Sequence, residues 1–200
     1  MGAEFAPVLQ FWFGDVDELG RSDARHSRRW FTADGAFDRE VADRFGETYA
    51  DVRAGGRDAW LDDPRGRVAF VIVLDQFPRN MFRGTGRMFE GDRQALAAAS
   101  EGVARHHDQQ LSANERSFLY MPFMHSEELA MQDRSVALFT ALAAGAPPAL
   151  RASLQGSVRY AERHREIIAR YGRFPHRNAL LGRESTPEEN AYIAQPGSGF

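Results

Sequence analysis

The chain has 200 residues, of which 43% are hydrophobic and 26% are charged, so it is long enough to bury one sizeable core. Its formal net charge of −3 gives no overall field that would attract nucleic acid or an anionic membrane surface. All 25 basic residues are arginine, and cysteine is absent. These absences exclude disulfides, thiolate metal sites, Schiff-base enzymes and P-loop enzymes.

The N-terminal stretch has no basic region ahead of its apolar residues, and no apolar run is long enough to span a bilayer. We therefore expect a cytoplasmic protein with neither a nucleic-acid nor a membrane partner. We assign no cofactor and no metal, and we expect one all-helical domain over residues 1–200.

The predicted helices follow from apolar positions spaced three and four apart and from signals at their ends. Residues 4–13 form a short buried helix that stops at Gly14, and an Arg/Asp-rich loop follows. Asp34 is the N-cap of the next helix, which ends before the glycine pair at 55–56. A third helix is predicted over residues 92–107.

Residues 68–77, with the sequence VAFVIVLDQF, fit either a buried strand or a buried helix. No second strand-like run exists to pair with them, and an isolated strand leaves its backbone groups unmatched. We therefore predict a buried helix that Pro78 ends or kinks.

The second half of the chain contains two capping boxes. The first, at residues 112–115, opens one long helical pattern that continues to Phe139 with a kink at Pro122. Another helix ends at Gly172, and on it His164 lies in a run of charges that predicts a solvated face. The second box, at residues 186–189, opens a short final helix.

A polar motif occurs twice, as FPRNMFRG at residues 77–84 and as FPHRNALLG at residues 174–182. Each copy places an arginine and an asparagine where a helix is predicted to stop. A guanidinium fork beside an amide donor can hold a carboxylate or a phosphate. Alternatively, the proline ends the helix, the asparagine forms a turn and the arginine bonds nearby carbonyl groups.

The candidates for acid–base chemistry lie within MPFMHSEE, residues 121–128. On one helix, His125 and Glu128 would share a face as a proton-transfer pair or as two metal ligands. Asp75 and Arg79 would be neighbours at i,i+4. The alternatives are structural: His125 would pair with a carboxylate of its helix, and Asp75 and Arg79 would form a buried ion pair.

Four blocks, LDQFPRN (74–80), YMPFMHSE (120–127), RFPHRN (173–178) and STPEE (185–189), are similar to the hallmark blocks of a bacterial family, domain of unknown function nine-two-four. The early LQFWFG and the closing PGSGF also fit, so the resemblance covers the whole chain. The resemblance implies an all-helical fold grouped with tetratricopeptide-like superhelices, and it implies no established reaction.

Two functions are compatible with these residues. The first is a cleft for a small phosphorylated or carboxylated metabolite, with hydrolysis or isomerisation by acid–base groups. Its acid–base candidates are His125, Glu127, Glu128 and Asp75. Its ligand-binding candidates are Arg79, Asn80, Gln76, Arg173, His176, Arg177 and Asn178. A metal site from His125, Glu128 and His176 is a less favoured variant.

The second function is a helical-repeat interaction module that holds the acidic end of a partner peptide. The first function requires His125, Arg79 and Arg177 to converge, and it fails if they lie more than about 12 Å apart. We also expect the tail, residues 196–200, to fold back toward the polar cleft.

Overall fold

The computed structural model describes residues 4–197 and is helical without named strands over that range. Its α-helices are α1 (Ala6–Phe13), α2 (Ala24–Arg29), α3 (Gly35–Arg53), α4 (Pro64–Val71), α5 (Phe77–Met81), α6 (Asp92–Ala104), α7 (Ala113–His125), α8 (Leu129–Gly145), α9 (Pro148–Tyr171) and α10 (Pro187–Ile193). The prediction of an all-α array is confirmed. The single-domain organisation over residues 1–200 stays a prediction.

Most helix ends predicted from a local signal agree with the structure; Pro78 is an exception, described below. Gly14 follows α1, Asp34 caps α3, and Gly172 ends α9 in the left-handed conformation with φ 68°. Ser112 and Thr186 each form a complete capping box, at the starts of α7 and α10. The six-residue helix α2, capped by Asp23, was not expected within the Arg/Asp-rich loop.

Residues 64–81 form a buried helical rod at the centre of the molecule. It consists of α4, a single π-helical turn (Ile72–Gln76) and α5. Pro78 therefore does not end the helix, which continues to Met81. In the π-turn the N–H of Phe77 donates to the carbonyl of Ile72, five residues back, immediately before the proline that cannot donate.

The predicted long helical pattern over residues 112–139 is wrong, because it contains two helices. α7 ends at His125, Ser126 is extended, and α8 begins at Leu129. The side-chain amide of Gln132, on α8, donates to the carbonyls of Met124 and Ser126 and so satisfies the end of α7. The apolar spacing continues across the break because both helices pack on the same core.

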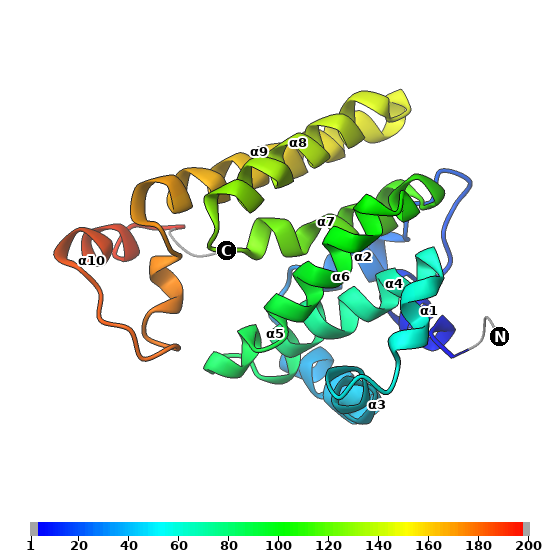
Figure 1. Ribbon diagram of the computed structural model, residues 1–200, viewed down its shortest axis with the longest axis horizontal. Coiled ribbons are helices and arrows are strands. Elements are labelled where there is room, and N and C mark those ends of the chain that lie inside the picture. The colour runs from blue at the N-terminus through cyan, green and yellow to red at the C-terminus, as the bar shows by residue number, and fades with distance from the viewer. Residues whose placement is uncertain (1–3, 198–200) are drawn as a thin grey trace.

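Figure 1 shows α8 and α9 running side by side along one face of the molecule, with α7 beneath them and α3 at the opposite side. One hydrophobic cluster extends from Val8 in α1 to Ala161 in α9, and a small second cluster surrounds Phe174. Residues 173–185, which we call the C-terminal arm, connect α9 to α10. The arm lies beside the end of the central rod.

No helix within residues 4–197 is long and apolar enough to cross a membrane. At the end of this range, the carbonyl oxygen of Gly197 accepts a hydrogen bond from Arg163 on α9. The last three residues of the predicted tail, 198–200, lie outside the described residues.

We predict opposite stability effects for alanine at two glycines. A Cβ on Gly91 would overlap the backbone carbonyl of Leu74 in the π-turn, whereas a Cβ on Gly46, in α3, would meet nothing within 4 Å. Gly91→Ala should lower the free energy of unfolding by about 1–3 kcal/mol. Gly46→Ala should raise it by roughly 0.5–1 kcal/mol. Chemical denaturation of both variants checks this, and wild-type stability of Gly91→Ala would contradict it.

Candidate functional site

A buried carboxylate–imidazole pair forms the centre of the site. Asp75, in the π-turn, is fully buried, and its Oδ1 accepts a hydrogen bond of 2.7 Å from Nδ1 of His125 at the end of α7. Its Oδ2 accepts a hydrogen bond of 2.5 Å from the amide of Gln76. Arg79, one helical turn further along, has Nη1 3.4 Å from Oδ1 and also bonds the Asp75 carbonyl.

The charges around this pair determine its protonation. Burial opposes ionisation of Asp75, but Arg79 and His125 outweigh it and hold the pKa of this carboxyl below its ordinary value. Burial and the charge of Arg79 lower the pKa of His125, against the opposing effect of Asp75. At neutral pH His125 is therefore neutral, with Nδ1–H donating to Asp75 and the lone pair of Nε2 available.

A second carboxylate joins the two arginines of the duplicated motif. Asp92, the first residue of α6, accepts from Nη1 and Nη2 of Arg79 at 2.9 and 3.2 Å. Its Oδ2 also accepts from Nη1 of Arg177 at 3.2 Å. The two copies of the motif, on α5 and on the C-terminal arm, therefore meet at one carboxylate.

Arg177 is held in an unusual environment for a guanidinium. It is 7% exposed, and its Cζ lies 4.5 Å from the ring centroids of both Phe89 and Phe174. Its Nε–H is buried and has no hydrogen-bond partner among the residues that the structure describes. Burial, reinforced by the charge of Arg79, lowers its pKa to about 10, so it remains charged at neutral pH.

Aromatic contacts connect Arg177 back to His125. The ring of Phe174 lies 5.5 Å from that of His164, which lies 6.4 Å from that of His125. His164 is only 4% exposed, so the prediction of a solvated face is wrong at this position. Burial lowers the pKa of His164 to about 3, and it is neutral at physiological pH. The turn of α9 that carries it faces the core, although its sequence neighbours are charged.

The structure therefore brings the sequence-predicted residues Asp75, Gln76, Arg79, His125 and Arg177 into one connected set, together with Asp92, which was not predicted. We call Asp75, Arg79, Asp92, His125 and Arg177 the polar cluster; Gln76 is bonded to it. The side chains of Arg79, Asp92 and His125 retain 19%, 18% and 13% exposure, so solvent reaches the cluster at these three groups. His176 lies at its border, with its ring 5.6 Å from Phe174, and burial lowers its pKa to about 4.

The other predicted site residues lie outside the polar cluster. Asn80 donates to Asp38 of α3, Arg173 forms a bidentate pair with Glu189, and Asn178 donates to Ser185 and Glu189. Glu128 is exposed and stands at the start of α8, so it does not share a helix face with His125. Each of these three residues thus joins its own segment to another helix through a carboxylate, Asp38 of α3 or Glu189 of α10.

Glu127 joins the α7–α8 corner to the C-terminal arm. It accepts hydrogen bonds of 2.7 and 2.9 Å from Arg183 and one of 2.8 Å from the backbone N–H of Phe174. Burial alone would raise the pKa of Glu127, but these hydrogen bonds outweigh it and hold the pKa below its ordinary value.

Sequence reasoning missed Asp92, Phe89 and Arg183. Asp92 was recognised only as the start of a helix, and its two arginine partners lie 13 and 85 positions away. Within residues 4–197 no three His, Asp or Glu side chains are placed to hold one metal ion, so the variant site from His125, Glu128 and His176 is not formed.

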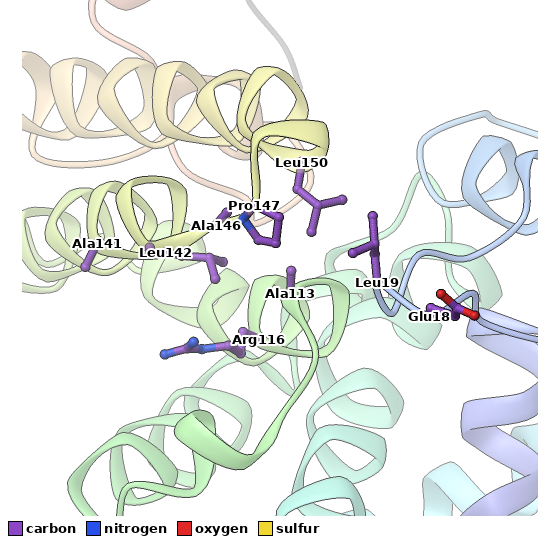
Figure 2. Close-up of a pocket in the computed structure, with 10 residues that line it drawn as sticks. Glu18, Leu19, Ala113, Arg116, Ala141, Leu142, Ala146, Pro147 and Leu150 are labelled. Atoms are coloured by element: carbon purple, nitrogen blue, oxygen red, sulfur yellow. The ribbon is translucent and has the colours of Figure 1, made fainter.

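Two cavities of about 300 Å³ lie away from the polar cluster. Figure 2 shows the first, which is mainly apolar and lies between the start of α7, the α8–α9 turn and the loop at Leu19. The second lies between α1, α2 and α3 and includes Arg25, Arg29 and Arg44. None of the polar cluster residues lines either cavity.

We predict that Glu127→Gln lowers the free energy of unfolding by roughly 1.5–3 kcal/mol at pH 7, because it removes a charged acceptor of three hydrogen bonds. A carboxyl whose pKa is lower in the folded protein than in the unfolded one stabilises the fold above its unfolded pKa of about 4.3. It loses this contribution as the pH falls through its folded pKa. The difference from wild type should therefore vanish in acid. Urea denaturation across pH measures it, and Glu128→Gln, an exposed neighbour, is the control with little change. An equal effect in both variants would contradict the prediction.

Comparison with known proteins gives a family but no activity. A family model described as "Bacterial protein of unknown function (DUF924)" matches residues 8–197. The chain is similar to the solved structure of a protein of unknown function, ATU0120, from Agrobacterium tumefaciens, at 37% identity and a TM-score of 0.81. The alignment covers 95% of this chain and 96% of that one. No curated protein matches. Because the family model matches nearly the whole described chain, the protein belongs to this bacterial family of unknown function.

Proposed function

We propose that the polar cluster binds a small anionic metabolite and that His125, oriented by Asp75, transfers a proton to or from it, as hydrolysis or isomerisation requires. The observation that carries this proposal is the buried Nε–H of Arg177, which lacks a partner in the described chain. A buried donor on a charged group is costly to leave unpaired, and an anion satisfies both its hydrogen bond and its charge.

The Asp75–His125 pair supports the catalytic part of this proposal. The carboxylate fixes the tautomer of the imidazole through a hydrogen bond of 2.7 Å and leaves Nε2 as the reactive nitrogen. A buried carboxylate also stabilises the imidazolium that forms when Nε2 accepts a proton. Such a pair can accept a proton at Nε2 or, once protonated there, donate it.

The interaction-module alternative, and the tetratricopeptide-like superhelix with it, stay predictions. An acidic peptide would be held by accessible arginines with unmatched charge. In the polar cluster both arginines are largely buried and both bond Asp92. A small ligand that approaches from the partly exposed side of Arg79 and His125 fits this arrangement better than an extended peptide.

A thermal-shift screen of carboxylates and phosphorylated metabolites tests the proposal. A ligand at about 100 times its Kd should raise the melting temperature of the wild type by roughly 5 °C or more, through mass action. The rise should be absent in Arg177→Gln and retained in the control Arg170→Gln, an exposed arginine on α9 that pairs with Glu188.

Two outcomes would refute the proposal. One is that no anion in the screen stabilises the wild type. The other is that the stabilisation persists in a folded Arg177→Gln protein. A hit that needs Arg177 identifies the substrate class for turnover assays, in which His125→Gln should bind the ligand but transform it at least a hundredfold more slowly.

A further inference from the structure

The structure also indicates which anion the polar cluster takes, and this step rests on the proposed function. We infer that the ligand is a monocarboxylate that meets the Nε–H and Nη2–H edge of Arg177, and that its binding adds one proton to Nε2 of His125. Three features support this inference: the geometry of the guanidinium, the balance of fixed charge and the place where a proton can be held.

Other arginines of this chain show what the Nε/Nη2 edge binds. Arg83 uses it to hold both oxygens of Asp38, at 2.6 and 2.8 Å. Arg173 uses it to hold both oxygens of Glu189, at 2.6 and 2.7 Å. A planar carboxylate matches this edge with two parallel hydrogen bonds.

The same edge of Arg177 makes no hydrogen bond to the described residues, because its bond to Asp92 uses Nη1. Arg177 is also far more buried than Arg83, whose side chain is 42% exposed. The buried fork thus keeps unused the pair of donors with which the other two arginines hold the two oxygens of a carboxylate.

The fixed charges of the polar cluster cancel. Arg79 and Arg177 carry two positive charges, and Asp75 and Asp92 carry two negative ones. Beyond them, Glu127 is matched by Arg183, and burial keeps His164 and His176 neutral. A bound monoanion therefore leaves one uncompensated negative charge, and a phosphate dianion leaves two, in surroundings of low dielectric constant.

One proton restores neutrality for a monoanion, and His125 is the group best placed to hold it. Its Nδ1 bonds the carboxylate of Asp75, which stabilises a protonated imidazole, and its side chain retains 13% exposure. Protonated on both nitrogens, His125 would donate Nδ1–H to Asp75 and Nε2–H toward the bound oxygen. The single proton available at this position favours a monocarboxylate over a phosphate dianion.

Isothermal titration calorimetry with acetate, propionate and benzoate, and with inorganic phosphate and sulfate as rival probes, tests the inference. Titrations in two buffers of different ionisation enthalpy should give uptake of about one proton per carboxylate bound at pH 7.5. The carboxylate Kd should rise by roughly tenfold per pH unit above pH 7. In His125→Gln, carboxylate should still bind but without proton uptake.

A second readout uses the wild-type protein alone and does not depend on the folding of a variant. In ¹⁵N NMR of the imidazole nitrogens, saturating carboxylate should move Nε2 of His125 to the protonated shift and leave His164 and His176 unchanged. Phosphate that binds more tightly than every monocarboxylate, or an Nε2 shift that does not change, would overturn the inference while leaving the proposed function intact. Absence of any Arg177-dependent anion binding would overturn both.

Discussion

The buried carboxylate of Asp75 is the interaction on which the site depends. A charged group without solvent is tolerated only when other groups compensate it, and here His125, Arg79 and Gln76 do so from two helices and the π-turn. Arg79 then requires Asp92, and Asp92 in turn holds Arg177 of the C-terminal arm. Compensation of one carboxylate thus fixes how α5, α6, α7 and the arm meet.

The arginine and the asparagine of each copy of the duplicated motif bond different partners. The arginines share Asp92, whereas the asparagines, which are also buried, bond Asp38 and Glu189. Each of these outer carboxylates is also held by an arginine through two hydrogen bonds. The arginines that the proposed function uses and the asparagines that join helices are therefore different residues of the motif, and the outer ion pairs hold the segments that carry these arginines.

The burial of Arg177 carries a cost in stability. Its burial lowers its pKa, and one of its donors lacks a partner in the described chain. The rest of the local network, including the bidentate pair of Glu127 with Arg183, is well satisfied and holds the arm against the α7–α8 corner. Proteins commonly concentrate such unsatisfied groups where a ligand binds.

The sequence alone determined the helical class and most helix ends, because these depend on residues three or four positions apart, and it determined the family through four sequence blocks. Asp34, Ser112 and Thr186 marked helix starts, and the repeated Arg–Asn pair marked the region of the site. Only the tertiary structure decided that α7 and α8 separate after His125, that His164 is buried, and that Asp92 joins Arg79 to Arg177. The bonds that assemble the polar cluster connect residues up to 85 positions apart, and helical periodicity carries no information at that range.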